Sequence, residues 1–329
     1  MDAPVLGVYD QLQGSEQKWE ISWTWRYQHS FRHFVGTVEQ PHRVSEDSNV
    51  INHINLTELG IRYNFTPRNS VTVTIPYLIA TRSYAIRDQD RNVVGRTQVQ
   101  AHGLSDVTIV GRRLLFDPAA AHRGNISVGL GIKLPTGADS TVDTRLRTDE
   151  NGNLVPSLET NDQSIQPGDG GFGIIVDASG YRNLARWANL TAYGSGGYLI
   201  NPSGTNGVYT YRGRPAEAIM SVADQYLARV GLLVAPASWK GLSLGLGGRW
   251  EGVPVHDLIG SSEGFRRPGY AVSIEPSLTW THGNNTLSLA VPYAVRRDRQ
   301  RSVPDLESGT HGDAAFADYL YLLGWWHRF

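Results

Sequence analysis

Histidine and serine residues are the first candidates for chemistry in this sequence. His29 precedes Ser30 and His256 precedes Asp257, so each base lies beside a possible catalytic partner. Hydrolysis by a serine nucleophile needs a Ser, a His and an orienting amide or carboxylate in one place. Polar segments contain many such neighbours, and no spacing singles out a triad. An enzyme is therefore the less favoured class.

A second candidate is a metal site, because His29, His33, Glu39 and His42 lie close together in the sequence. Imidazole and carboxylate groups are common metal ligands. Histidines in polar segments are more often ordinary surface residues than ligands. We predict no metal and no cofactor.

Charged residues that alternate with apolar ones form a third set. In Lys18 to Gln28, which reads KWEISWTWRYQ, aromatic and aliphatic residues alternate with polar ones, Glu20 and Arg26 among them. Side chains of a β-strand point to opposite faces in turn. This segment is therefore predicted to be a strand with a different solvent on each face.

Composition restricts the protein classes that fit this pattern. The chain has 329 residues, 40% of them hydrophobic, and no run near the roughly 18 apolar residues of a spanning helix. A net charge of -1 gives no reason to expect a nucleic-acid partner. Cysteine is absent, which suits a protein that crosses an oxidising compartment unfolded. The start, Met1 to Pro4, lacks the features of a signal peptide, so we expect a mature exported form.

The alternation recurs from end to end and predicts about twelve strands. An even number of strands, each about long enough to span a bilayer when tilted, is typical of single-chain outer-membrane barrels. The predicted strands are Lys18 to Gln28, Thr57 to Thr66, Val71 to Arg82, Leu104 to Phe116, Asn125 to Thr136, Gly171 to Arg182, Ala188 to Leu199, Val222 to Val234, Leu242 to Gly252, Tyr270 to Thr281, Thr286 to Arg297 and Phe316 to Phe329.

The connections alternate between short turns and long polar segments. Short periplasmic turns and long extracellular loops are typical of transmembrane β-barrels. We therefore predict an all-β transmembrane antiparallel barrel over residues 17–329, preceded by a periplasmic segment, residues 1–16. The long loop from Gly137 to Gly170 is the candidate to fold inward and narrow a pore. Proline lacks a ladder donor, so a bulge or kink is expected at Pro76 and Pro292.

Charged residues on the polar phase of these strands are predicted to line the interior of the barrel. A charge that faces lipid at the bilayer midplane costs about 2 to 4 kcal/mol, so these residues must point inward. They either pair across the interior as a structural plug or line a polar passage, and pairing is favoured for each one. Small inward residues such as Gly129 and Gly247 are expected to leave room for a narrow pore. The lining set is Glu20, Arg26, Arg62, Asp106, Arg112, Lys133, Asp177, Arg229, Arg249, Glu251, Glu275 and Asp318.

Aromatic residues lie near the ends of several predicted strands, where a barrel meets the two membrane interfaces. The last strand, Tyr319 to Phe329, reads YLYLLGWWHRF, and we expect the barrel assembly machinery to bind it. The predicted aromatic girdle is Trp19, Tyr27, Tyr270, Trp280, Tyr319, Trp325 and Phe329.

Three segments resemble a known family of proteins. They are Gly103 to Asp106, Gly131 to Gly137 and Gln166 to Gly170, which read GLSD, GIKLPTG and QPGDG. These segments are similar to recurring segments of the outer-membrane barrels named for the phenol meta-cleavage pathway. The resemblance implies a channel-like barrel and a role in the transport of aromatic compounds.

The function predicted from the sequence is an outer-membrane channel for passive diffusion of small molecules, apolar and aromatic compounds among the candidates. The alternative is a non-conducting barrel that acts as a scaffold or as a partner in an envelope assembly, and an enzyme active at the barrel rim ranks below both. Expected partners are outer-membrane lipid, lipopolysaccharide near the Arg296 to Arg301 cluster, and a small solute. The expected location is the bacterial outer membrane.

Overall fold

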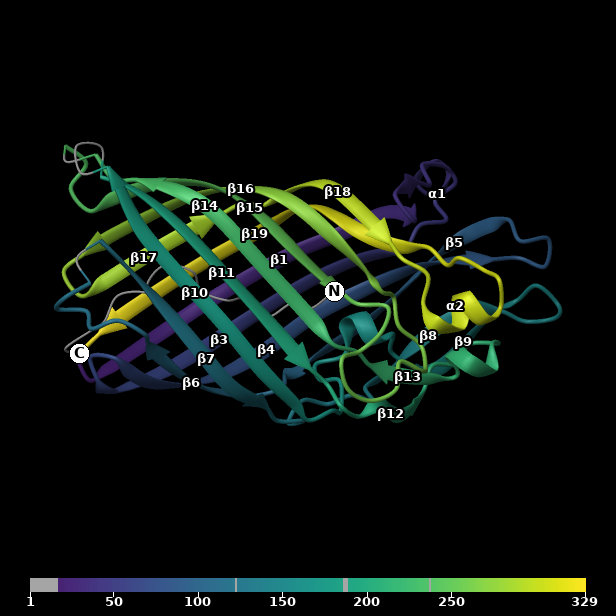
Figure 1. Ribbon diagram of the computed structural model, residues 1–329. Coiled ribbons are helices and arrows are strands. Elements are labelled where there is room, and N and C mark those ends of the chain that lie inside the picture. The colour runs from purple at the N-terminus through teal and green to yellow at the C-terminus, as the bar shows by residue number, and fades with distance from the viewer. Residues whose placement is uncertain (1–16, 122, 186–188, 237) are drawn as a thin grey trace.

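The strands form a closed barrel in the structure, a computed structural model (Figure 1). The structure describes residues 17–121, 123–185, 189–236 and 238–329. Residues 1–16, predicted as a separate segment, lie outside the described residues. The strands of the barrel are β1 (Trp19–Val35), β3 (Ile51–Thr66), β4 (Asn69–Arg87), β5 (Val93–Leu104), β6 (Thr108–Leu114), β7 (Gly124–Lys133), β10 (Gly173–Ala185), β11 (Leu190–Ile200), β14 (Gln225–Val234), β15 (Leu242–Val253), β16 (Gly269–His282), β17 (Asn285–Ala290), β18 (Tyr293–Arg299) and β19 (Ala314–Arg328).

These segments form a closed antiparallel barrel of 12 strands, as the sequence predicts. β5 and β6 act as one interrupted strand beside β4, and β17 and β18 act as another beside β16. β19 pairs with β1, with Arg328 opposite Glu20 and Ala314 opposite Phe34, and this pairing closes the barrel. Among the described residues, no helix is long and apolar enough to cross a membrane.

β7 shows why these sequences form a wall with lipid on one side. Ser127 is buried inside the barrel, while the alternate residues Ile126, Val128 and Leu130 are exposed on the outside, Leu130 by 66%. A soluble protein would bury these aliphatic residues. Apolar residues outside and polar ones inside are the arrangement of a barrel in a membrane.

Long connections gather at one end of the barrel, on the right in Figure 1, which we call the loop end; the other end is the short-turn end. The loops contain β2 (Val38–Glu39), α1 (His42–Ser45), β8 (Val142–Thr148), β9 (Leu154–Thr160), η2 (Gln163–Ile165), β12 (Gly204–Tyr209), η3 (Pro215–Glu217), β13 (Ile219–Val222) and α2 (Val303–Glu307). β8 pairs with β9, and β12 pairs with β13, as two separate two-stranded sheets.

Several barrel strands extend beyond their predicted ends at the loop end. The predicted loop from Ser83 to Gly103 is instead the end of β4, a tight turn and most of β5. In β5, Val99 and Ala101 are buried while Gln98 and Gln100 are exposed. The outer face is therefore polar here, as on a hairpin that stands in water above the membrane, and the alternation that identifies lipid-facing strands is reversed.

The two prolines behave differently. Val291 and Pro292 interrupt the strand between β17 and β18, as predicted. β4 runs through Pro76 without a register shift on the β3 side, so no bulge lies between β3 and β4 at this position. The interruption falls on the neighbouring strand instead, between β5 and β6, where the amide of Ser105 donates to the carbonyl of Pro76 at 2.9 Å.

Candidate functional site

A cavity of about 810 Å³ lies inside the barrel. Its lining extends from Arg43 and Asp313 among the loops to Thr72 and Arg112, which lie a few residues from the short-turn end of their strands. Cavities that hold small molecules commonly have this size. The cavity therefore follows the wall formed by β3, β4 and β6 for most of the length of the barrel.

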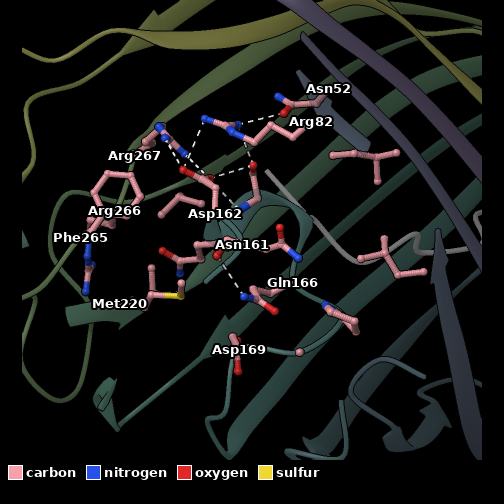
Figure 2. Close-up of a pocket in the computed structure, with 18 of the residues that line it drawn as sticks. Asn52, Arg82, Asn161, Asp162, Gln166, Asp169, Met220, Phe265, Arg266 and Arg267 are labelled. Carbon is pink, nitrogen blue, oxygen red and sulfur yellow. Dashed lines mark hydrogen bonds and ion pairs between the residues drawn. The ribbon is translucent and has the colours of Figure 1, made fainter. Parts of the chain in front are cut away.

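The long loop between β7 and β10 supplies one side of this cavity, so the segment predicted to fold inward does so. Asn161 donates to the carbonyl of Gln100 on β5 at 3.0 Å, and Gln166 donates to the carbonyl of Asn161 at 3.0 Å. The side chain of Gln166 also accepts from the amide of Thr141 at 3.0 Å. These bonds fix the segment from Thr160 to Asp169, which we call the inner loop, against the inside of the wall (Figure 2).

Asp162 in this loop is surrounded by arginines. Arg267 donates two hydrogen bonds of 2.8 Å to its carboxylate, and Arg82 and Arg212 lie at 3.3 and 3.4 Å (Figure 2). Burial opposes the charge of Asp162, but the charges of Arg267 and Arg82 outweigh burial and hold its pKa well below the ordinary value. Asp162 is therefore ionised and links the inner loop to β4 and to the loop before β16.

Two aromatic rings beside Asp162 each carry two guanidinium groups. Arg145 lies 4.0 Å and Arg82 5.0 Å from the ring centre of Tyr84. Arg212 lies 3.6 Å and Arg267 4.6 Å from that of Phe265. Planar guanidinium groups stack well on aromatic rings, so the arginines are held in fixed positions around the cavity.

Apolar side chains also line the cavity, along the wall of the barrel. Ile54 and Leu78 belong to a buried cluster that also contains Val99 and Ile165, and Leu56 packs against it. Val110, Ile175 and Leu199 form a second cluster further along the wall. The cavity thus has a cationic part near the loops and an apolar strip along the barrel wall.

A ladder of buried charges connects β14, β15, β16 and β1. Arg229 contacts Glu275, whose other oxygen lies 3.5 Å from Arg249. Arg249 lies 2.6 Å from Glu251, which lies 3.6 Å from Arg26. Of these five residues, only Arg26 lines the cavity. The ladder therefore fills the interior on this side with paired charges.

The structure buries eleven of the twelve charged residues that the sequence places in the interior. Besides the ladder, Arg112 pairs with Asp177 at 2.9 Å, and Glu20 pairs with Arg328 at 3.0 Å and with Arg62 at 4.0 Å. Four of the twelve line the cavity: Arg26, Asp106, Arg112 and Lys133. The buried residues are Glu20, Arg26, Arg62, Asp106, Arg112, Lys133, Asp177, Arg229, Arg249, Glu251 and Glu275.

Asp318 is the twelfth residue, and it lies at the loop end, beside a register shift between β1 and β19. Its carboxylate contacts Arg32 at 2.7 Å and Arg297 at 2.5 Å, and its side chain is 22% exposed. The predicted basic cluster from Arg296 to Arg301 lies in the same region, and its arginines differ in exposure. Arg296 is exposed, whereas Arg297 and Arg299 are buried, Arg299 in contact with Asp305.

The three segments that carry the family resemblance meet at Asp106. Its carboxylate accepts from the amides of Gly137 and Asp169, at 3.0 and 3.2 Å, and lies 3.6 Å from Lys133, which also contacts Asp169. We call this meeting point the Asp106 junction. It lies at the interruption between β5 and β6, where the inner loop leaves the wall and returns to it.

The predicted aromatic girdle residues are all partly exposed. Trp19, Trp280, Tyr319 and Phe329 expose between 41% and 57% of their surface, and Tyr27, Tyr270 and Trp325 expose less. Trp19 and Phe329 lie beside each other at the short-turn end, because the amide of Phe329 donates to the carbonyl of Trp19 at 2.9 Å.

The catalytic candidates are not assembled into a triad in the described part of the chain. His29 stacks on His53, with ring centres 4.4 Å apart, while Ser30 is buried and accepts from Gln28. Asp257 is bound by Arg266 at 2.5 Å. The described residues also contain no group of three or more histidine, aspartate or glutamate residues placed to hold a metal.

Sequence reasoning missed the arginines of the loops: Arg145, Arg147, Arg212 and Arg267 line the cavity although none lies on a predicted strand. The sequence shows only that loops are rich in arginine. Which of them face one cavity depends on how three separate loops pack.

No protein-family model matches the chain, and no curated protein matches it in sequence. Solved structures share its fold. An outer membrane channel from Pseudomonas putida F1 is 12% identical, with a TM-score of 0.61 over 98% of this chain and 99% of that one. The β domain of the Bordetella autotransporter BrkA is 11% identical, with a TM-score of 0.51 over 95% and 100%. The Ralstonia pickettii toluene transporter TbuX is 8% identical, with a TM-score of 0.50 over 98% and 92%.

Proposed function

We propose that the protein is an outer-membrane channel through which small organic molecules diffuse passively, apolar and aromatic compounds among them. The observation that carries this proposal is the cavity of about 810 Å³, which follows the inside of a closed barrel for most of its length. In this proposal the loop end is extracellular and the short-turn end is periplasmic.

The lining suits molecules that are partly apolar. The strip containing Ile54, Leu78 and Val110 offers apolar contacts, while the arginines near Asp162 offer hydrogen bonds. A solute that meets several weak contacts in succession can enter and leave, which diffusion through a channel requires. The inner loop from Thr160 to Asp169 would set the width of the passage.

Two of the similar structures have names that agree with this proposal: one is described as an outer membrane channel and the other as a toluene transporter. The resemblance of the Asp106 junction segments to the phenol meta-cleavage barrels points in the same direction. Low identity restricts both comparisons to the fold, so the support for transport comes mainly from the cavity.

A barrel that does not conduct, and that acts as a scaffold, is the second candidate. The charge ladder from Arg229 to Arg26 favours it, because paired charges on one side of the interior reduce the open cross-section. The two candidates differ in whether solutes can pass beyond Thr72 and Arg112 at the short-turn end of the cavity.

Single-channel conductance in a planar bilayer separates them. The refolded full chain is compared with a variant in which the loop from Ala138 to Gln166 is replaced by a short Gly/Ser link. We expect steady openings in the intact protein and larger ones in the variant. A matched control replaces only the hairpin tip from Asp149 to Asn153, which does not line the cavity, and should leave conductance unchanged. Silence from inserted protein, both intact and without the loop, would contradict the channel and support the scaffold.

A further inference from the structure

Five arginines that line the cavity share two acids, Asp162 and Glu159. In the part of the chain that the structure describes, Asp162 contacts Arg82, Arg212 and Arg267, while Glu159 contacts Arg147 and lies 3.8 Å from Arg145. Five cations thus face two carboxylates. We call Arg82, Arg145, Arg147, Arg212 and Arg267 the arginine cluster; all five line the cavity. The neighbouring Arg214 is occupied by Glu217 and Asp305, at 3.8 and 3.4 Å.

Some donors of the cluster are buried without an acceptor. The Nε groups of Arg82 and Arg145 have no hydrogen-bond partner among the described residues, although Arg82 is only 4% exposed. Arg212 reaches Asp162 through one contact of 3.4 Å and exposes 35% of its side chain. Because buried donors are normally satisfied, unpartnered guanidinium N–H groups beside a cavity indicate that an acceptor binds there.

The electrostatics agree with this reading. Burial and, after it, the charge of Arg267 outweigh the charges of Asp162 and Glu217 and lower the pKa of Arg212 to about 10. Burial also lowers the pKa of Arg145, with the charges of Arg147 and Arg82 acting in the same direction. Both groups lie in loops, and both lack part of the negative charge that would compensate their burial. An anion in the cavity would supply it.

The surroundings define the kind of anion. Met220 and Val99 line the cavity beside the cluster, with Ile165 buried behind Val99 in the same apolar cluster, and the apolar strip continues from there along the wall. A carboxylate matches the planar fork of a guanidinium, and an apolar body attached to it would lie on the strip. Inorganic phosphate would satisfy the arginines but would leave the strip without a partner.

We propose that the arginine cluster binds the carboxylate of small organic acids with an apolar or aromatic body, such as benzoate. This inference deepens the proposed function, since it names a class of solute for the same cavity. Arg212 and Arg145 donate to the carboxylate, and Asp162 holds Arg82, Arg212 and Arg267 in place. The ring of the solute lies against Met220 and the strip.

The test measures binding to the full-length protein in detergent by isothermal titration calorimetry. Benzoate is compared with benzyl alcohol, which has the same ring without a charge, and with inorganic phosphate. We expect benzoate to bind at least about tenfold more tightly than either, because hydrogen bonds to charged groups account for a difference of this size. Equal affinity of benzoate and benzyl alcohol would overturn the carboxylate site, and phosphate binding as tightly as benzoate would overturn the assignment to organic acids.

Substitutions locate the site. Arg212→Gln and Arg145→Gln should each weaken benzoate binding about tenfold and leave benzyl alcohol binding unchanged. Arg212→Lys keeps the charge and should recover part of the affinity. Arg296→Gln removes an exposed arginine that does not line the cavity, and should bind benzoate like the parent protein. The shift in gel mobility on heating, which folded barrels show, checks that each variant is folded. Unchanged benzoate binding in folded Arg212→Gln and Arg145→Gln would refute the site.

The two measurements test the carboxylate site and the channel separately. If benzoate binds as expected while the protein remains silent in bilayers, the site stands and the channel does not. If the protein conducts but shows no preference for benzoate over benzyl alcohol, the channel stands and the carboxylate site is refuted.

Discussion

Arg267 donates two hydrogen bonds of 2.8 Å to the carboxylate of Asp162, although the two residues are 105 positions apart in the chain. One lies in the inner loop and the other in the loop that precedes β16. A two-pronged contact between a guanidinium and a carboxylate fixes orientation as well as distance. This pair therefore ties the inner loop to the loop that precedes β16.

Replacing Asp162 should release the inner loop. Asp162→Asn removes the negative charge shared by Arg82, Arg212 and Arg267, and a broken buried pair costs about 3 to 5 kcal/mol. We expect trypsin to cut the β8–β9 hairpin at Arg145 or Arg147 much faster than in the parent protein, while the barrel stays folded. Glu150→Gln at the exposed hairpin tip is the control and should not change the cutting rate. Equal cutting rates for all three proteins would show that Asp162 does not hold the loop.

Acid should loosen the loop end only at low pH. Burial opposes the charge of Asp313, but the hydrogen bond with His33 and the charges of His33, Arg43 and Arg267 together outweigh burial and lower its pKa to about 2. The pKa of Asp162 is also well below its ordinary value. A carboxylate with a lowered pKa stabilises the fold above its unfolded pKa, and this contribution is lost as pH falls toward the folded pKa. The stabilisation from these two carboxylates should therefore be constant from about pH 8 to about pH 5 and should be lost below about pH 4. Melting followed by circular dichroism measures this, and a loss of stability already between pH 7 and pH 5 would contradict it.

Breaking the charge ladder should destabilise the barrel itself. Glu275 is fully buried between Arg229 and Arg249, so Glu275→Gln leaves two buried guanidinium groups with one carboxylate fewer. The expected cost is about 3 to 5 kcal/mol in the free energy of unfolding, measured by urea titration in detergent. Glu263→Gln, at an exposed loop position, serves as the control and should cost less than about 0.5 kcal/mol. Equal midpoints for the two variants would show that the ladder carries little stability.

The Asp106 junction should tolerate no side chain at Gly168. A Cβ at this position would lie 2.5 Å from the carbonyl oxygen of Gly137 and 2.8 Å from the carboxylate of Asp106. Gly168→Ala should therefore cost about 1 to 3 kcal/mol, because backbone atoms must move apart. The same measurement on Gly248→Ala, where a Cβ meets nothing within 4 Å, should show little change. If both variants unfold at the same urea concentration, the close approach at the junction is not needed.

The sequence predicts the barrel well because two solvents leave a period-two pattern. Glu20, Arg249 and Glu275 alternate with apolar residues, so their burial follows from the alternation alone. The pattern fails for β5 above the membrane, where water replaces lipid and Gln98 and Gln100 face outward. The strand signal is present there, but with its two faces exchanged.

Interior space could not be predicted in the same way. Gly129 and Gly247 were expected to leave room for a pore, since they lack side chains. A Cβ on Gly247 would lie 2.5 Å from the hydroxyl of Tyr193, and the carboxylate of Asp177 occupies the space beside Gly129. The glycines accommodate large neighbours from adjacent strands. Which neighbour fills a gap depends on strand register, and the sequence pattern does not reveal it.

The pairing of β1 with β19 brings Glu20 and Arg328 into contact across 308 positions. Pairing neighbouring strands along the chain closes only short loops. The pairing of β1 with β19 closes a loop of nearly the whole chain, so it carries the largest entropic cost of loop closure. Until it forms, every intermediate has two open strand edges that could pair with another molecule. The pairing of β19 with β1 is therefore the step at which assembly competes with aggregation. A circular permutant that joins Phe329 to Gln17 would make a different strand pair the last to form.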